Sequence, residues 1–258
     1  MAHSLKNGLG LASVALFIAV WELGARSGAV TEFMLPRLSA VLLRMVDDFA
    51  SGELLGALGL TLYRVLTGFA IASIAGILIG LAMSRNRTIH WLLDPMISVA
   101  FPMPKIAFLP IVTLALGFGD VAKLFMVVVD TIIPIITATI AGAQAAEKEL
   151  RWSARSLGAS DREVWREIVL PAALPQVLTG MQVALPIAMV IVVVTEMVMG
   201  GGGVGGAMIA ASRFSDSPGV FAGIVEIGLL GYCIVKGMSL LRRHVLRWHQ
   251  EASDVTTV

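Results

Sequence analysis

Residues 173–199 read ALPQVLTGMQVALPIAMVIVVVTEMVM, an apolar stretch whose single charged residue is Glu196. A helix of roughly 20 mostly apolar residues crosses the hydrocarbon core of a bilayer. An isolated strand could not satisfy its backbone polar groups in lipid, and the strands of a membrane barrel alternate in polarity over roughly 10 residues. The stretch therefore predicts a transmembrane helix and an all-α membrane protein.

The composition of the whole chain agrees with a membrane protein. Of the 258 residues, 57% are hydrophobic and 14% are charged, and the mean hydropathy is +0.86. Soluble domains carry about 25% charged residues. A net charge of +1 gives no reason to expect nucleic acid as a partner, and the single Cys233 excludes an internal disulfide. Thirteen methionines occur without a matching His or Cys cluster, so we expect no metal site.

Six segments are apolar enough to span a membrane, and we expect them to form one transmembrane domain over residues 1–258. The first follows Lys6 and resembles the apolar part of a secretory signal, but no small-residue cleavage site follows it, so we expect it to be retained. The third contains Pro102, Pro104 and Pro110, which each remove a helical donor. It is either a broken helix or an interfacial helix followed by a span that begins near Ile106. The expected spans are about 9–24, 62–83, 92–117, 124–144, 173–199 and 218–241.

Lysine and arginine gather on one side of these spans. The side with both termini, loop 84–91 and loop 145–172 carries 11 of them, and the opposite side carries 5. Because cytoplasmic loops are enriched in Lys and Arg, both termini are predicted to be cytoplasmic. The 11 are Lys6, Arg85, Arg87, Lys148, Arg151, Arg155, Arg162, Arg166, Arg242, Arg243 and Arg247, and the 5 are Arg26, Arg37, Arg44, Lys123 and Arg213.

Three smaller patterns lie outside the charged loops. The outer segment 25–61 contains a short amphipathic run that predicts an interfacial helix, formed by Val41, Leu42, Met45, Val46 and Phe49. Gly76 and Gly80 form a small-xxx-small pair that allows close helix packing. The glycine run at 200–206 lacks the Lys-Ser/Thr ending of a phosphate-binding loop, so we expect a tight turn there.

Loop 147–171 is the most charged part of the chain. Residues 147–167 hold ten of the 37 Lys, Arg, Asp and Glu residues, five of each sign. Ser160 and Glu163 have the spacing of a capping box, in which each side chain satisfies a free backbone donor at a helix start. Gly158 is the expected hinge between this helix and an earlier one around 147–157, and Pro171 can open the next helix. The loop is therefore predicted to be a folded helical elbow.

The second helix of the elbow has one apolar face, formed by Val164, Trp165, Ile168 and Val169. Such a face could dock into a groove on a partner protein or rest on lipid headgroups. The balanced charges favour docking, because helices that lie on lipid are usually basic on their polar face.

The same loop resembles a known sequence motif. Residues 153–160 and 168–175 are similar to the "EAA" loop of binding-protein-dependent ABC importer permeases. The family pattern is Glu-Ala-Ala, three residues, Gly, nine residues, Ile, one residue and Leu-Pro. Gly158, Ile168 and Leu170-Pro171 match this spacing, whereas Trp152 and Ser153 stand where the family has Glu and the first Ala.

The resemblance extends over most of the chain. Landmarks at 35–37, 61–69, 109–110, 117–119, 195–197 and 221–224 look like those of the permeases for nitrate, taurine, aliphatic sulfonates and some heterocyclic or aromatic compounds. The resemblance implies a type I importer in the bacterial inner membrane. Its partners would be a second permease subunit, as in a homodimer, two cytoplasmic ATPases and an external solute-binding protein.

In this reading the chain is not an enzyme and holds no cofactor, and the partner ATPases bind ATP and magnesium. The translocated solute would be small and anionic. The residues that the resemblance assigns to ATPase coupling are Ala154, Gly158, Ala159, Ser160, Glu163, Trp165, Ile168, Leu170 and Pro171.

Three carboxylates fall inside the expected spans: Asp130, Glu196 and Glu226. Because ionisable groups are costly in lipid, they face protein or water. They could line the pathway or a subunit interface, but a structural role across helices is the favoured interpretation.

Two other classes of function are alternatives for this chain. A channel or carrier that needs no ATPase remains an alternative, and an intramembrane hydrolase is a weaker one. The histidines lie near the ends of spans or outside them, and the sequence has neither an H-E-x-x-H pair nor a G-x-S-x-G elbow.

Overall fold

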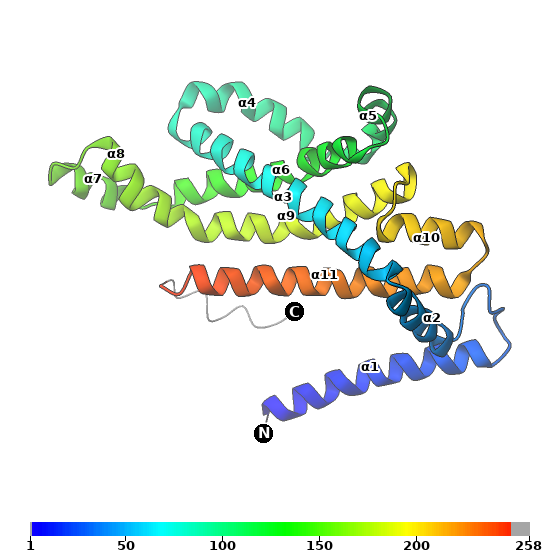
Figure 1. Cartoon of the computed structure of the whole chain (residues 1–258). Helices are drawn as coiled ribbons and strands as arrows, with labels where there is room; N and C mark the ends of the chain where they lie inside the picture. The colour runs from blue at the N-terminus through cyan, green and yellow to red at the C-terminus, as the bar shows by residue number, and fades with distance from the viewer. Residues whose placement is uncertain (1, 249–258) are drawn as a thin grey trace. The chain divides into compact units, whose positions relative to one another are not determined.

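The computed structural model describes residues 2–248, except for the side chains of residues 2–9 and 11. Helices are the only regular elements in the described range, as predicted (Figure 1). They are α1 (Ala2–Arg26), α2 (Leu38–Ser51), α3 (Glu53–Arg85), α4 (Arg87–Ala100), a 3-10 turn (Lys105–Phe108), α5 (Leu109–Leu116), α6 (Asp120–Ala145), α7 (Lys148–Ser156), α8 (Asp161–Val164), a π-helical segment (Trp165–Val169), α9 (Leu170–Met199), α10 (Gly203–Arg213) and α11 (Ser217–Val245).

The chain divides into two compact units. Unit 1 comprises Met1–Thr61 and Glu196–Leu230, and unit 2 comprises Leu62–Thr195 and Gly231–Val258. Helices α3, α9 and α11 contribute residues to both units.

In unit 2, glycines bring α3 against α6. A Cβ added at Gly68 would lie 2.6 Å from Val127 Cγ1, and one added at Gly80 would lie 2.7 Å from Thr139 Cβ. A Cβ added at Gly76, which lies between these two, would be 3.0 Å from Ile135 Cγ2 in α6, a slightly looser approach. Small residues let backbones approach closely where lipid provides no hydrophobic drive for helix association. The close packing expected from the pair Gly76 and Gly80 is confirmed, and Gly68 extends it.

Small residues also join the next two pairs of helices in unit 2. A side chain at Gly142 would lie 2.7 Å from the Ala173 carbonyl oxygen, which brings α6 against α9. Helix α11 approaches α9 at Gly231, and Arg242 Nη1 donates a hydrogen bond of 2.9 Å to Gln182 Oε1. The four helices α3, α6, α9 and α11 therefore form the framework of this unit.

The predicted spans at 62–83, 124–144, 173–199 and 218–241 lie within helices long and apolar enough to cross a membrane. Four such helices occur among the described residues: α3, α6, the continuous helical segment Asp161–Met199, and α11. A fifth is reached if Arg87–Ala100 and Lys105–Leu116, bent by 89°, form one broken span.

The third predicted span is broken where its prolines cluster. Pro102 and Pro104 fall between α4 and the 3-10 turn, and Pro110 lies in the first turn of α5, where no donor is lost. The first predicted span, 9–24, falls in α1, whose side chains are described only in part, and its place as a span stays a prediction.

In unit 1, α1 and α2 are joined by polar contacts. The Glu22 carboxylate accepts hydrogen bonds from Leu38 N (2.8 Å) and Ser39 Oγ (3.1 Å) at the start of α2. Trp21 donates to the Pro36 carbonyl at 3.0 Å, and its ring lies edge-on to that of Phe221 with centroids 5.6 Å apart. The helix expected from the amphipathic run is α2.

Helix α10 was not predicted from the sequence. The glycine run predicted only a turn, whereas the last part of the run begins an eleven-residue helix. Glycine-rich segments are poor helix formers, so local preference could not indicate this helix.

The glycine packing gives a direct test. Gly80→Ala should lower the stability of the folded chain by about 1–3 kcal/mol, because the added methyl meets Thr139 and the Ile136 carbonyl. Gly59→Ala in the same helix meets nothing within 4 Å and should stabilise by about 0.5–1 kcal/mol. Thermal unfolding of the detergent-purified protein measures both, and equal effects of the two substitutions would contradict close packing at Gly80.

Candidate functional site: the helical elbow and the buried carboxylates

The elbow begins with α7, which is tied to the end of α6. Arg151 Nη2 donates a hydrogen bond of 2.6 Å to the carbonyl oxygen of Ala143, in the last turn of α6. Carbonyls in the last turn of a helix have no intrahelical partner, and a basic side chain satisfies them. Arg155 pairs with Asp161 at 2.8 Å and links α7 to α8. The two short helices are therefore held to each other and to a candidate spanning helix.

The turn between α7 and α8 depends on Gly158. Its φ of +93° lies in the left-handed region, which favours glycine. Ala159 N donates to the Ala154 carbonyl at 3.0 Å, and Gly158 N donates to the Arg155 carbonyl at 3.0 Å. These two bonds form a Schellman motif, a standard helix ending with glycine in this position. The predicted hinge is confirmed as a defined turn.

Helix α8 starts with the predicted capping box. Glu163 N donates to Ser160 Oγ at 3.4 Å, and the Glu163 carboxylate accepts from Ser160 N at 2.7 Å. The π-helical segment follows and leads directly into α9, with Pro171 in the first turn of that helix. No break separates the second half of the elbow from a candidate spanning helix, because Asp161–Met199 is one continuous helical segment.

The apolar face of the second elbow helix packs inward. Val164 and Val169 are 3% and 2% exposed. Trp165 and Ile168 pack against a buried cluster formed by Ala143, Ala146, Val169, Ala173 and Val177. The face that was expected to dock on a partner is therefore covered by the chain itself. Periodicity identifies a face that needs burial, but it does not identify what buries it.

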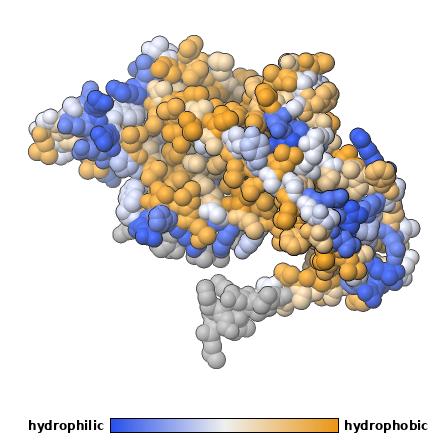
Figure 2. All heavy atoms as spheres, viewed as in Figure 1, coloured by the Kyte–Doolittle hydropathy of each residue, from blue (hydrophilic) through white to orange (hydrophobic). Residues whose placement is uncertain are grey.

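Different apolar side chains are exposed on the elbow. Leu157, beside the glycine turn, is 87% exposed, and Trp152 and Leu150 on α7 are more than half exposed. Figure 2 shows that the end of unit 2 with α7 and α8 is mostly hydrophilic, which makes these side chains exceptional there. Their place in a charged segment is the sequence signal that could have identified them.

Residues 68–247 match the family described as "Binding-protein-dependent transport system inner membrane component". The chain belongs to this family. It is a non-catalytic permease component of a binding-protein-dependent ABC transporter and a multi-pass protein of the inner membrane. An ATPase and a binding protein are the partners that such a transporter implies.

Relatives of the permease cover most of its length. It is 30% identical over 239 residues to a protein named as an aliphatic sulfonates transport permease of Bacillus subtilis (strain 168), covering 93% of this chain and 87% of the relative. It is 28% identical to the taurine transport system permease protein of Escherichia coli (strain K12), covering 94% and 90%. It is 25% identical to the nitrate import permease protein of Synechocystis sp. (strain ATCC 27184 / PCC 6803 / Kazusa), covering 93% and 89%.

Solved structures share the fold. The crystal structure of an amino acid ABC transporter with histidines aligns with a TM-score of 0.64 at 19% identity, covering 78% of this permease and 97% of that chain. An inward-facing MetNI methionine ABC transporter aligns with a TM-score of 0.52 at 16% identity, covering 72% and 94%.

Glu196, one of the three predicted intramembrane carboxylates, caps α10 within unit 1. Its carboxylate accepts hydrogen bonds from Thr61 Oγ1 at 2.9 Å and from Gly205 N at 3.1 Å, and Thr61 Oγ1 accepts one from Val204 N at 3.0 Å. Glu196 and Thr61 are both 0% exposed. Backbone donors at a helix N-terminus stabilise a negative charge, so the amides at the start of α10 help to compensate the buried carboxylate.

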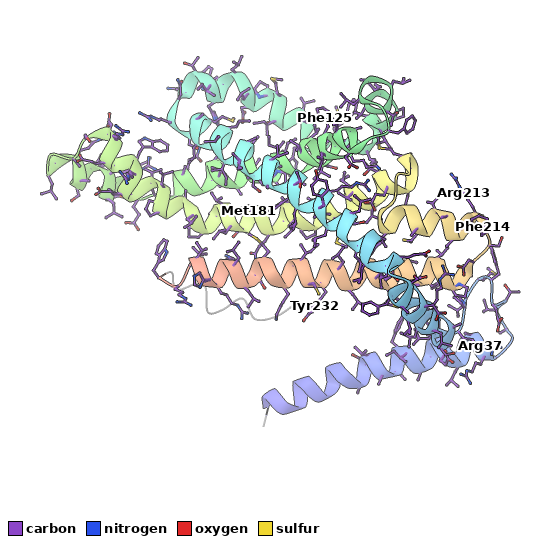
Figure 3. All side chains as sticks on the ribbon, in the orientation of Figure 1. Arg37, Phe125, Met181, Arg213, Phe214 and Tyr232 are labelled. Atoms are coloured by element: carbon purple, nitrogen blue, oxygen red, sulfur yellow. The ribbon has the colours of Figure 1, made fainter. Side chains whose placement is uncertain are left out.

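The four glycines before this cap have a common conformation. Gly200 to Gly203 have φ values of 71°, 84°, 78° and 82°. At Gly203 a Cβ would overlap the Glu196 carboxylate. The run lines a hollow of about 730 Å³, with Glu53, Leu60 and Arg213 on its walls. Figure 3 shows Arg213 and Phe214 at the end of α10. Gly203 is therefore required by the Glu196 carboxylate, which leaves no room for a side chain at this position.

The other two carboxylates have different surroundings. Asp130 in α6 pairs with Lys105 Nζ at 3.2 Å, and both side chains are less than a fifth exposed. Glu226 lies in unit 1 beside a small hollow that Arg44 and Asp48 also line, and within the described residues its buried Oε1 has no hydrogen-bond partner. Asp130 and Glu196 thus have the structural partners that the favoured interpretation required.

Unit 2 contains a further charged pair that was not predicted from the sequence. Arg64 in α3 is 2% exposed and pairs with Asp120 Oδ1, in the first turn of α6, at 2.7 Å. An arginine just inside a predicted span is a signal for such a partner, since an unpaired charge at membrane depth is costly. The pair adds a polar link to the glycine contacts between these helices.

The cap on α10 can be tested by comparing two glycines. Gly203→Ala should destabilise by at least about 1–2 kcal/mol, because alanine is strained at positive φ and its methyl meets Glu196. Gly206→Ala in the same helix meets nothing within 4 Å and should be neutral or stabilising. Hydrogen exchange at the Val204 and Gly205 amides measures the effect. Unchanged protection in Gly203→Ala would show that the cap does not hold the helix start.

Proposed function

We propose that this permease forms the translocation path for a small anionic solute, delivered by a solute-binding protein, and that it is coupled to cytoplasmic ATPases through the elbow at 147–171. The observation that carries the proposal is the continuous path from the capped turn at Gly158, through α8 and the π-helical segment, into α9. A force applied to such a turn by a partner moves a spanning helix rather than a loose loop.

Within this proposal the elbow residues have three roles. Gly158, Ser160 and Glu163 hold the angle of the turn through the Schellman motif and the capping box. Trp165 and Ile168 join the elbow to the packed ends of α6 and α9. The remaining coupling residues expected from the family motif flank these two groups: Ala154, Ala159, Leu170 and Pro171.

The contact with the ATPase is proposed at the exposed apolar side chains Trp152 and Leu157. Exposed leucine and tryptophan in a hydrophilic segment lower the free energy of association when a partner buries them. Trp152 stands at the position where the family motif has an acidic residue, which supports an apolar first contact in this permease instead of a charged one.

The chemistry of the solute is proposed from the relatives. Their names specify aliphatic sulfonates, taurine and nitrate. These solutes share a group in which three oxygens surround a central sulfur or nitrogen. The proposed cargo of this permease is therefore a solute with such an oxyanion group.

The proposed assembly contains two copies of this chain and two ATPases, which bind ATP and magnesium. The proposed topology has six spans, including α1 and the broken third span, and both termini in the cytoplasm. The excess of Lys and Arg on the side of the elbow supports this orientation.

Orientation can be measured with engineered thiols. In a Cys233→Ser background, cysteine at Ser156 should be labelled by a membrane-impermeant maleimide only after the cells are opened, because α7 is expected in the cytoplasm. Cysteine at Ser212, exposed near the end of α10, should be labelled in intact cells whose outer barrier is permeabilised. The opposite pattern would reverse the proposed topology.

Coupling can be tested at Leu157. Leu157→Asp should leave unfolding unchanged, because the side chain is 87% exposed, but should reduce solute uptake at least about tenfold if about 1.4 kcal/mol of contact energy is lost. Leu157→Met keeps an apolar contact and should retain uptake. ATP hydrolysis and uptake are measured together in proteoliposomes. Full uptake by Leu157→Asp, or failure of the chain to copurify with any ATPase, would overturn the proposed coupling.

A further inference from the structure

A basic pocket lies beside the elbow in unit 2. It has a volume of about 970 Å³ and is formed by the end of α3, the start of α4 and the helical segment that follows Ser160. Among the described residues, four arginines line it: Arg85, Arg87, Arg162 and Arg166. None of the described lining residues is acidic, and apolar side chains such as Leu81 and Ile89 form part of the wall.

The four guanidinium groups are available for an anion. Among residues 2–248, none of them forms an ion pair with a carboxylate or a hydrogen bond with a protein acceptor. The Arg85 guanidinium lies 5.9 Å from the centroid of the Trp165 ring, and that of Arg87 lies 5.2 Å from the Trp91 ring. Aromatic faces hold the cations in place and leave the N–H groups at the guanidinium edge unused. Like charges gathered in one pocket repel each other, so a bound anion relieves an unfavourable interaction.

The position of the pocket indicates where the anion comes from. Arg85 is the last residue of α3, and Arg162 and Arg166 lie in the first turns of the segment Asp161–Met199; both helices are candidate spans. Residues just past a span of roughly 20 apolar residues lie at the level of lipid headgroups, and Arg85 is two residues past the predicted span 62–83. Trp91, whose ring is beside Arg87, is 68% exposed, and tryptophan is enriched at that level.

We infer that this pocket binds the phosphate headgroup of an anionic phospholipid, at the membrane surface on the side of the elbow. Basic pockets between spanning helices bind such headgroups. The arginines pair with the phosphate oxygens in the forked geometry that guanidinium favours. The apolar wall at Leu81 and Ile89 accommodates the start of the acyl chains, which a small soluble oxyanion lacks. The site depends on the membrane location of the chain and not on the proposed contact at Leu157, which does not line the pocket.

A bound lipid in this position would affect the elbow itself. Arg85 belongs to α3, whereas Arg162, Trp165 and Arg166 belong to the second half of the elbow, in α8 and the π-helical segment. A headgroup shared between these elements stabilises their present arrangement. The lipid would therefore act on the same element through which coupling is proposed, by a separate contact.

The experiment is a lipid titration of the full chain, purified in detergent with whatever subunits it retains and followed by native mass spectrometry. Phosphatidylglycerol should bind more tightly than phosphatidylcholine. Arg85→Gln and Arg166→Gln should each weaken phosphatidylglycerol binding by about fivefold, since one basic residue near an anionic lipid contributes about that factor. Arg166→Lys keeps the charge and should lose less than Arg166→Gln. Arg247→Gln removes an exposed arginine that does not line the pocket and should change little.

Four results would overturn the inference. Equal affinity for the two lipids in the unmodified chain would show that charge does not select the ligand. An equal loss in Arg247→Gln would show general attraction rather than a pocket. Displacement of phosphatidylglycerol by equimolar inorganic phosphate or ethanesulfonate would show a site for a soluble anion. Finally, Arg166→Gln could lose binding because the chain is destabilised. If Arg166→Gln has a lowered unfolding temperature and Arg166→Lys is unfolded as well, the role of Arg166 is structural.

Discussion

Helices that share a bilayer gain little by burying apolar surface against one another, because lipid tails are as apolar as leucine side chains. Their association must come from close packing and from polar contacts, and both features depend here on glycine. Gly68, Gly76 and Gly80 let α6 approach the backbone of α3, and Gly142 does the same between α6 and α9. The framework of unit 2, and with it the base of the elbow, depends on these close approaches.

The lipid environment also restricts where charged side chains can lie. An ion at membrane depth needs a partner, and Arg64, Lys105 and Glu196 each have a different one. Arg64 pairs with Asp120, and Lys105 pairs with Asp130, which holds the break in the third predicted span against α6. Glu196 is satisfied by a hydroxyl and by the amides at the start of α10. These contacts connect elements that apolar packing alone would leave free to slide.

The elbow combines a rigid turn with a surface left for a partner. Its angle is held by local bonds around Gly158 and by the capping box, and its inner face is packed against the ends of α6 and α9. Two of its apolar side chains, Trp152 and Leu157, stay exposed. The arginine pocket at the end of α3 uses a third surface. Three separate contacts, with a protein, with the spanning helices and with lipid, can thus meet at one short segment.

Much of the helical structure was predictable from short segments of the sequence. Long apolar runs predicted the spanning helices, three prolines predicted the break, and the spacing of Ser160 and Glu163 predicted the start of α8, because each of these signals acts within a few residues. The direction of the apolar face at Val164 and Val169 was not predictable in the same way. A face that needs burial has the same periodicity whether a partner or the chain itself covers it.

The sequence by itself determined that this protein is helical, lies in a membrane and carries a capped elbow, because hydropathy, proline and capping residues act locally. Only the tertiary structure decided which charged side chains pair with each other. It also decided that the end of the glycine run forms a helix and which apolar side chains of the elbow stay exposed. The contact between Thr61 and Glu196 joins positions 135 residues apart, and no local preference encodes it. Such pairs are selected by the packing of whole helices, which brings distant side chains within hydrogen-bond distance.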